Sequence, residues 1–292
     1  MIQRGLALAR GIKGRVLRAK DRMKQKIRQS RFIASIRPSD VFIVTYPKSG
    51  TTWLSFLIAH FLKPEDAELT LKNLYDYVPG IVIESLENDP IQQFGSLPDP
   101  RIFANHSVYT PGFPRVIYVL RDPRDVLLSC WHGHRLLIKD FNLSLKEYLL
   151  LENHWPCSWA QHVEDWIFKY KHPRLLLIRF EDAKRNTPKV LKQVLDFIGL
   201  DHDDHRIEKA VQASSFDRMR SLEENSGMMI PVNGARDERF MRRGKVEGWR
   251  DELDPESLAI IEQKCGLVMR MVDYETTTQA REGPPPKNLS VF

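Results

Sequence analysis

Residues 41–53 read VFIVTYPKSGTTW, and this stretch decides the fold. Its first five residues, Val41 to Thr45, are apolar or β-branched, which predicts a short buried strand. A Pro-Lys-Ser-Gly turn follows the strand. Residues 52–62, TWLSFLIAHFL, then predict a buried helix that ends near Pro64. A strand, a tight turn and a helix in this order form the unit from which parallel sheets covered by helices are built.

The same alternation of strands and helices continues along the chain. Residues 114–120 (PRVIYVL) and 175–180 (LLLIRF) predict two further strands. Residues 125–132 and 187–198 predict helices after them. Because parallel strands need helical connections, the pattern predicts an α/β fold with three layers, α/β/α, around a central parallel sheet.

Helix and domain boundaries follow from local signals. In the helix at residues 187–198 we expect Thr187 at the N-cap, Pro188 at the first position and Gly199 at the end.

The pattern of strands and helices predicts one domain at residues 36–280. We expect a flexible C-terminal tail at residues 281–292, where three consecutive prolines interrupt any regular structure.

The composition is that of an ordinary globular protein. Hydrophobic residues make up 42% of the 292 residues and charged residues 28%, which excludes collagen-like, low-complexity and wholly disordered chains. No apolar run approaches 18 residues, so we expect no transmembrane helix. The three cysteines are far apart and form no C-x-x-C pair. We therefore expect no disulfide framework, no structural zinc site and a reducing, cytoplasmic location.

Positive charge is concentrated at the N-terminus. Residues 1–31 contain eleven Lys or Arg and one acid, for a charge of +10, whereas the other 261 residues carry −4. Apolar residues recur at steps of three or four, so residues 1–35 are predicted to form a separate basic amphipathic segment. Peripheral contact of residues 1–31 with an anionic membrane, docking of a partner, a targeting peptide and a solvated arm all fit this pattern.

The turn after the first strand has the properties of a phosphate-binding loop. It lies beyond the carboxyl end of a strand, where parallel sheets bind ligands. The helix that follows aims backbone N–H groups and the positive end of its dipole at one point. Gly50 permits a close approach, Thr51 and Thr52 add hydroxyl donors, and Lys48 adds a cation. The string differs from the G-x-x-x-x-G-K-[ST] nucleotide loop, because the Lys precedes the Gly.

A second candidate phosphate site follows the strand VIYVL. Arg121 stands at the end of that strand, and Ser129 lies two turns into the next helix, so both can reach one phosphate. Arg offers a bidentate fork and Ser a hydroxyl. Asp122 or Asp125 in the same string also fits a helix cap, and the two roles are compatible.

A third candidate is the loop string RRGKVEGWR at residues 242–250. Arg242 and Arg243 stand before Gly244, and two arginines on such a loop can wrap a phosphate from the far side. Taken alone, the segment is equally typical of a solvated basic loop.

Together these strings resemble the signature of the sulfotransferases that use 3′-phosphoadenosine 5′-phosphosulfate (PAPS), and of their cytosolic type, from about Asp40 to Tyr274. The resemblance implies a P-loop NTPase-like fold with a loop that binds the 5′-phosphosulfate group. By this match Lys48 contacts the bridging oxygen, Thr51 and Thr52 hold the 5′-phosphate, and Trp53 stacks on adenine. The matching loop residues are Lys48, Ser49, Gly50, Thr51, Thr52 and Trp53.

The resemblance also assigns the remaining donor contacts. It implies a 3′-phosphate site made by Arg121, Ser129, Arg242, Arg243 and Gly244. It implies adenine contacts from Ser214, Phe216 and Phe180. Departures stand in these strings: Phe180 replaces the usual Tyr, Ser214 stands where the family has Thr, and Glu247-Gly248 stands where it has Gly-Asp.

Sulfuryl transfer to a hydroxyl needs a base for the hydroxyl proton, and His has a suitable pKa. Residues 100–106, PRIFANH, are similar to the family's P-R-[IL]-x-[KA]-[TS]-H, which implies that His106 is the catalytic base. By the same match Lys48 stabilises the leaving oxygen. Asn105 departs from the family's Thr or Ser, and Ala104 stands where many members have Lys.

The resemblance implies PAPS as co-substrate, a small-molecule acceptor with a hydroxyl or amine, and no nucleic-acid partner; the oligomeric state stays open. Aromatic and methionine side chains in the variable parts of the sequence favour an apolar acceptor; these residues are Tyr75, Tyr77, Phe141, Trp155, Met228 and Met229. No metal is expected, because His132 and His134 have no acidic or Cys partner at ligand spacing. Two alternatives remain: a nucleotide-dependent phosphotransferase, and a non-catalytic membrane- or partner-binding protein that keeps the fold.

Overall fold

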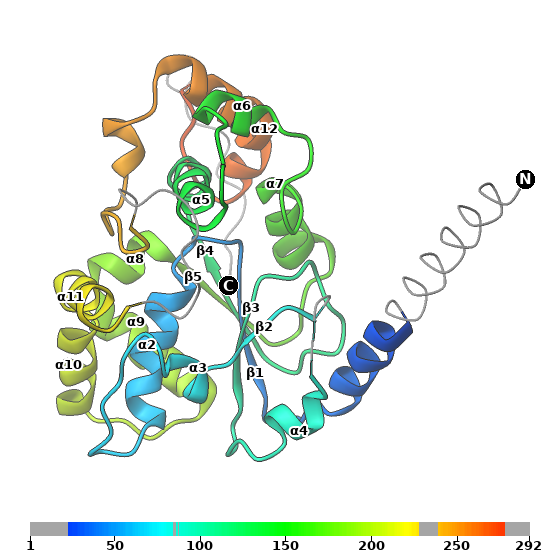
Figure 1. Ribbon diagram of the computed structural model, residues 1–292, viewed down its shortest axis with the longest axis vertical. Helices are drawn as coiled ribbons and strands as arrows, with labels where there is room; N and C mark the ends of the chain where they lie inside the picture. Colours follow the sequence, from blue (N-terminus) through cyan, green and yellow to red (C-terminus); the bar gives the residue numbers. More distant parts are fainter. Residues whose placement is uncertain (1–22, 84–85, 87, 228–238, 278–292) are drawn as a thin grey trace, which may run out of the picture.

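The computed structural model describes residues 23–83, 86, 88–227 and 239–277. In this part of the chain, a parallel sheet of five strands forms the centre, in the order β2-β3-β1-β4-β5 (Figure 1). The strands are β1 (Val41–Thr45), β2 (Gly80–Ile81), β3 (Ile102–Asn105), β4 (Val116–Leu120) and β5 (Leu175–Arg179). The strand before the predicted phosphate loop is thus the central one, with neighbours on both sides.

The sheet divides the core into two clusters, because alternate residues of a strand point to opposite faces. In β1, Val41 and Ile43 pack on one face, whereas Phe42 and Val44 pack on the other. All five β1 residues are buried, which explains why the strand is a continuous apolar run rather than an alternating one.

Helices cover both faces of the sheet, so the three-layer α/β/α prediction is confirmed (Figure 1). The face of Ile43 is covered by α2 (Thr51–Leu62), α3 (Leu74–Tyr77), α8 (Phe180–Arg185), α9 (Thr187–Ile198), α10 (Asp204–Ala213) and α11 (Phe216–Ser226). The face of Phe42 is covered by α4 (Pro90–Phe94), α5 (Pro123–Leu137), α6 (Leu145–Leu150), α7 (Trp159–Val163), the π-helical η2 (Glu164–Lys169) and α12 (Pro255–Met271). A 3₁₀ turn, η3 (Gly248–Asp251), precedes α12.

The predicted helix at residues 187–198 is confirmed, but its N-cap differs. The side chain of Asn186, not Thr187, accepts a hydrogen bond from the Lys189 N–H. The Thr187 hydroxyl instead donates to the Ala183 carbonyl in the preceding helix. At the other end Gly199 takes the left-handed conformation, with φ of 83°, as a helix-terminating glycine does.

Two strands escaped the sequence analysis. β3 has only four residues and β2 only two, so neither forms a run long enough to be recognised. They pair in parallel with each other, and β3 also pairs with β1. The consequence for the site is direct: His106 follows the carboxyl end of β3 and so lies beside the loop that follows β1.

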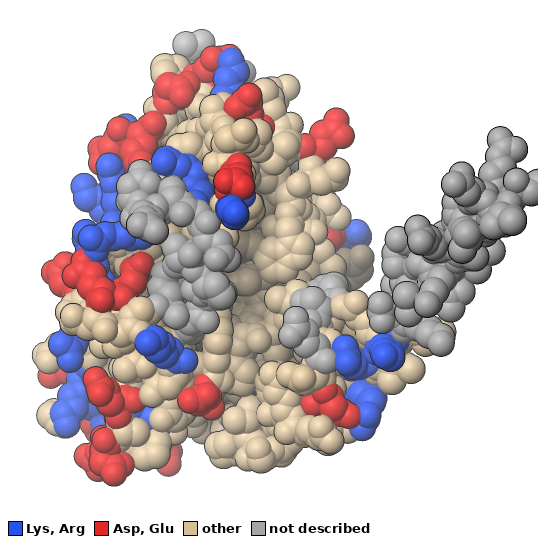
Figure 2. Space-filling view, in the orientation of Figure 1, with Lys and Arg blue, Asp and Glu red and all other residues tan. Residues whose placement is uncertain are grey.

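The N-terminal segment is described from residue 23 onward; residues 1–22 lie outside the described residues, as does the predicted tail at residues 281–292. Residues 23–34 are helical, and Phe32 of this helix is buried against Phe42, Phe94 and Phe103. Basic side chains gather where the helix meets the body (Figure 2). Among the described residues, no helix is long and apolar enough to cross a membrane.

Candidate active site

A cavity of about 470 Å³ opens at the carboxyl ends of the strands. Segments that follow β1, β3, β4 and β5 all contribute to its walls, as expected for a parallel sheet. Of the predicted site residues, Ser49 and Ser214 do not line it. The others do, and they are Lys48, Gly50, Thr51, Thr52, Trp53, His106, Arg121, Ser129, Phe180, Phe216, Arg242, Arg243 and Gly244. The fold thus brings together residues that are up to 196 positions apart in the sequence, from Lys48 to Gly244.

The phosphate loop depends on a backbone that only glycine adopts easily. Gly50 has φ of 107°, and a Cβ there would lie 2.7 Å from the ring of Phe180. The loop therefore packs directly on Phe180, which is why this ring is buried beneath it. Helix α2 begins at Thr51, and the N–H groups of a first helical turn have no acceptor within the helix. These N–H groups border the cavity and suit an anion.

Lys48 enters the cavity under unusual electrostatic conditions. Its Nζ lies 4.0 Å from the centre of the Phe240 ring. Burial lowers the pKa of Lys48 to about 8, and the charges of Arg121 and Arg242 contribute to this shift. Lys48 also has a positive φ of 69°, a conformation that costs a non-glycine residue roughly 1–2 kcal/mol. The loop therefore holds Lys48 in a strained backbone conformation, and the Lys48 ammonium group loses its proton more easily than an exposed one.

Arg121 is held from several sides but keeps one donor unused. Its guanidinium donates to the carbonyls of Lys48, at 3.0 Å, and Lys245, at 3.2 Å. It also stacks over the ring of Phe180 at 4.3 Å. Its Nε is buried and has no hydrogen-bond partner among the described residues. An anion in the cavity would satisfy this group, and Ser129 lines the same cavity from α5.

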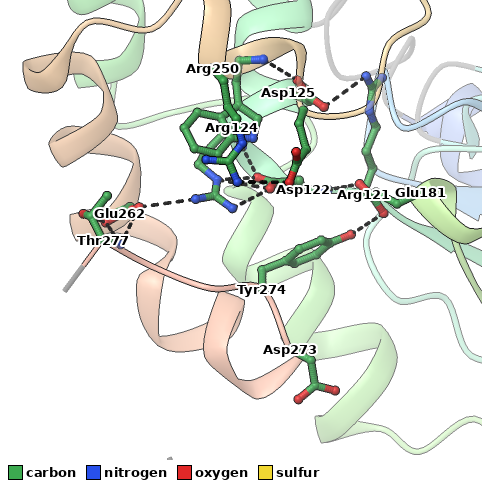
Figure 3. A network of polar contacts seen from close by, with 12 residues as sticks. Arg121, Asp122, Arg124, Asp125, Glu181, Arg250, Glu262, Asp273, Tyr274 and Thr277 are labelled. Carbon is green, nitrogen blue, oxygen red and sulfur yellow. Dashed lines mark hydrogen bonds and ion pairs between the residues drawn. The ribbon is translucent and has the colours of Figure 1, made fainter. Parts of the chain in front are cut away.

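A buried ionic network fixes the turn that carries Arg121 (Figure 3). Asp122 caps α5 by accepting from the Arg124 N–H, and its carboxylate also receives two donors of the Arg124 side chain. Glu181 accepts from the Asp122 N–H at 3.0 Å and from the Tyr274 hydroxyl at 2.8 Å. The compatible cap role that the sequence allowed for Asp122 is therefore confirmed.

The third predicted phosphate segment, residues 242–250, lines the cavity, and its arginines form ion pairs with Glu252. Arg242 Nη1 lies 2.7 Å from both carboxylate oxygens of Glu252, and Arg243 Nη1 lies 3.3 Å from the same carboxylate. A Cβ at Gly244 would come within 2.4 Å of the Phe216 ring, so glycine is required there. Glu247 occupies a left-handed position with φ of 57°, where the family pattern has glycine.

The three rings predicted to contact adenine, Trp53, Phe180 and Phe216, all line the cavity but make different contacts. Trp53 donates its indole N–H to the Ser214 carbonyl at 3.1 Å and contacts Phe180 edge to face. Phe216 lies below Gly244, and Lys184 lies 5.0 Å above the Trp53 ring. Ser214 thus acts through its backbone carbonyl and stands behind Trp53 rather than in the cavity wall. Lys184 was not identified from sequence, since no motif singles it out.

His106 presents one nitrogen to the protein and leaves the other for the cavity that it lines. Its Nδ1 lies 2.9 Å from the Thr45 carbonyl and 3.0 Å from the Thr45 hydroxyl. A carbonyl can only accept, so Nδ1 carries the proton and Nε2 keeps its lone pair. Burial lowers the pKa of His106, and the charge of Lys48 adds to this. His106 is therefore a neutral imidazole near pH 7 and can take up a proton at Nε2.

The remaining cavity wall is mostly apolar and aromatic. It includes Tyr75, Cys130, Leu137, Tyr148, Trp155 and Phe240. Tyr75 and Trp155 were expected here from sequence. Tyr77 and Phe141 were also expected but do not line the cavity, and Met228 and Met229 lie outside the described residues. Tyr148 and Phe240 were missed because they stand in no recognisable string.

The two histidines considered for a metal serve other contacts. His132 Nε2 lies 3.4 Å from a carboxylate oxygen of Glu252. His134 packs against Tyr148 and Phe141. Within residues 23–277, gaps aside, no three His, Cys, Asp or Glu side chains gather as a metal site.

The residues of the cavity fit a doubly phosphorylated donor such as PAPS. The cavity wall contains four cationic side chains from the predicted phosphate sites, namely Lys48, Arg121, Arg242 and Arg243. Asp125 is the acidic residue that also lines the cavity. The buried, unpaired Nε of Arg121 and the N-terminus of α2 offer donors for anions at separate places.

Comparison with known proteins gives the family. The family model described as "Sulfotransferase domain" matches residues 38–273. Cytosolic sulfotransferase 12 of Arabidopsis thaliana is 29% identical over 254 residues, which are 79% of this chain and 76% of the relative. Sulfotransferase 1E1 of Bos taurus is 29% identical over 232 residues, which are 74% of this chain and 78% of the relative.

Solved structures share the fold. Mouse sulfotransferase SULT7A1, complexed with PAP, is 24% identical, with a TM-score of 0.64 over 84% of this chain and 90% of that one. Retinol dehydratase, in complex with androsterone and the inactive cofactor PAP, is 21% identical, with a TM-score of 0.63 over 85% of each chain. The family match decides against a phosphotransferase and against a merely non-catalytic protein. The chain belongs to the sulfotransferase family and is a PAPS-dependent sulfotransferase.

Proposed function

We propose that this enzyme sulfates a hydroxyl, or an amine, of a small apolar acceptor, with His106 as the catalytic base. The observation that carries the proposal is the orientation of His106. Its Nδ1 is bound to the end of β1, and the residue lines the same cavity as the phosphate loop. A base must lie within hydrogen-bond reach of the proton that it removes, and this placement allows it.

The chain's own residues supply three functions for the reaction. PAPS, when bound, would supply the sulfuryl group, and breaking its S–O bond to the 5′-phosphate would release 3′-phosphoadenosine 5′-phosphate. His106 Nε2 accepts the proton of the acceptor hydroxyl. Lys48 brings positive charge to the phosphate loop, where negative charge grows during transfer. Thr51 and Thr52, with the N-terminus of α2, hold the 5′ side of the donor.

A second set of residues is proposed to read the 3′-phosphate. Arg121 and Ser129 approach it from the β4–α5 turn, and Arg242 and Arg243 approach from the loop before η3. Glu252 competes for the same arginines, because it already holds Arg242 through two contacts. When the 3′-phosphate binds, Arg242 would therefore exchange one anionic partner, Glu252, for another.

The apolar part of the cavity supports an apolar acceptor. Leu137, Tyr148, Trp155 and Phe240 form this part, and His106 lies 6.0 Å from Trp155, edge to face. Pockets of this kind hold small molecules by apolar contact and use few polar groups to orient them. Retinol dehydratase, which shares the fold, has been solved with androsterone and also with retinol, and both are apolar small molecules.

For the N-terminal segment we propose peripheral contact with an anionic membrane in the cytoplasm. In the described part of the helix, Met23 and Ile27 are exposed, with 60% and 52% of their surface accessible. They lie four residues apart among basic residues, which suits a helix on a lipid surface. Removing residues 1–31, which include Met23 and Ile27, should abolish sedimentation with anionic liposomes at low salt while leaving turnover unchanged. Equal sedimentation of both proteins would contradict this role.

The experiment that tests the main proposal is an acceptor screen with PAPS labelled in the sulfuryl group. Small phenols, aliphatic alcohols, amines and charged sugars are offered separately, and labelled product is counted. We expect transfer to apolar hydroxyl compounds and much weaker transfer to charged sugars. Transfer to charged sugars alone would overturn the apolar acceptor while leaving the family assignment intact.

A further inference from the structure

A fully buried histidine, His162, lies directly beneath the active-site loops, and no step of the proposed reaction uses it. Its side chain has 0% of its surface accessible. It comes from α7, yet it contacts residues on or shortly after three neighbouring strands. Its ring packs edge to face on Tyr46, which follows β1, and its two nitrogens reach Ser107, which follows β3, and Tyr118 of β4.

The hydrogen bonds of His162 define its tautomer. Its Nε2 lies 3.1 Å from the Ser107 carbonyl, which can only accept, so Nε2 carries the proton. Its Nδ1 then has a lone pair and accepts from the Tyr118 hydroxyl at 2.8 Å. Burial is the main cause that lowers the pKa of His162 to about 3, so the ring stays neutral at any working pH. A neutral ring with both nitrogens satisfied is a fixed connector rather than a proton carrier.

The Ser107 carbonyl is held by a second buried donor. Trp166, four residues after His162, donates its indole N–H to the same oxygen at 3.2 Å. On the other side of His106, the Asn105 side chain accepts from the Ser107 N–H at 2.6 Å. The backbone on both sides of His106 is therefore pinned, while the His106 ring itself is bound at Nδ1 to Thr45.

We propose that His162 is a positioning residue for the catalytic base: its N–H holds the Ser107 carbonyl so that His106 presents Nε2 to the acceptor. The inference rests on the proposed role of His106. His162 touches neither donor nor acceptor, because it is not in the cavity wall. Its effect should therefore fall on the chemical step and not on donor binding, since even a displacement of about 1 Å in a reacting group can lower a rate about 100-fold.

Two substitutions of His162 separate positioning from packing. In His162→Phe the ring volume stays but both hydrogen bonds are lost; in His162→Gln an amide N–H can again reach the Ser107 carbonyl. The matched control is His172→Phe. His172 donates from Nε2 to the Phe113 carbonyl at 2.7 Å, a bond of the same kind at the opposite, amino ends of β4 and β5.

We expect His162→Phe to lower kcat by about 10- to 100-fold, with the affinity for PAP, measured by calorimetry, within about twofold of the parent. His162→Gln should recover most of kcat, and His172→Phe should keep it. With ¹⁵N-labelled histidine, the His106 signal, identified by its loss in His106→Gln, should show Nδ1–H in the parent and a mixture of both tautomers in His162→Phe.

Several results would overturn the inference. One such result is a kcat of His162→Phe that lies within twofold of the parent value. Another is that His162→Phe loses kcat and PAP affinity equally and that His162→Gln recovers neither, because this would show that His162 matters only for packing. If His162→Phe does not fold, Trp166→Phe removes the other donor to Ser107, and an unchanged kcat there counts against the proposal. Full activity of His106→Gln would instead refute the base itself and so the proposed function.

Discussion

The donor side and the acceptor side of the cavity are built in different ways. On the donor side, contacts come from short continuous strings at strand ends, such as the loop after β1 and the turn after β4. Buried polar bonds reinforce them, as in the Asp122–Arg124 pair. The acceptor side is assembled from single side chains on separate segments, for example Tyr75 of α3, Tyr148 of α6 and Phe240. We infer that a change on the donor side alters rate or donor choice, whereas a change on the acceptor side alters which molecule is sulfated.

The largest expected effect is on the donor side, at Lys48. Lys48→Met should lower turnover by about 10²- to 10³-fold, because it removes a cation from the place where negative charge grows in the transition state. Donor binding should persist through the N-terminus of α2 and Arg121. Rapid-quench turnover and PAP calorimetry measure the two quantities, and an unchanged rate would remove Lys48 from the chemistry.

The next effect concerns the choice of donor. Adenosine 5′-phosphosulfate lacks the 3′-phosphate, so the parent enzyme should bind it much more weakly than PAPS. Arg121→Ala should remove about 1.5–3 kcal/mol of this preference, the usual contribution of a hydrogen bond to a charged group. The control is Arg206→Ala, whose guanidinium lies on Phe61, outside the cavity wall. Equal affinities of the parent for both donors would contradict the assignment of Arg121.

A smaller effect is expected in the pH profile, which tests His106 and Lys48 together. Burial lowers the pKa of His106 below its usual value of about 6.5, so its base form persists into mildly acidic solution. The pKa of Lys48 in the free enzyme is about 8, so kcat/KM should decline above that pH as the ammonium ion loses its proton. Lys48→Arg should move this alkaline limb upward, because guanidinium stays charged. A profile that stays flat up to pH 10 would contradict the role of Lys48, and an acid limb centred above pH 6.5 would contradict the lowered pKa of His106.

The smallest effect is expected on the free energy of unfolding, at Glu247 in the loop of residues 242–250, where the sequence departs from the family pattern. Glu247 has a left-handed backbone that glycine adopts without strain. Glu247→Gly removes that strain but adds unfolded-state entropy and loses an exposed ion pair with Arg250. The free energy of unfolding should rise by less than ~1 kcal/mol, read from chemical denaturation. A loss of stability would show that the Arg250 pair outweighs the strain.

The same contrast explains what could be predicted from sequence. The strand Val41–Thr45 and the loop after it are continuous strings, so the structure of both, and the place of the loop in the cavity wall, follow from local chemistry. Tyr148 and Lys184 stand alone in their segments, and only the tertiary fold brings them to the cavity. The short β3 was missed for a related reason: four residues become a strand here only because β1 and β2 pair with them.

The central claim is that one cavity holds both the donor loop and the base that activates the acceptor. Its most direct test is single-turnover transfer of labelled sulfuryl from PAPS, in His106→Gln and in the parent, with an acceptor found by the screen. The account predicts that His106→Gln binds PAP as the parent does, yet transfers about 10²- to 10⁴-fold more slowly. Transfer at the parental rate with intact PAP binding would contradict it, because the proton would then leave by a route that does not need His106.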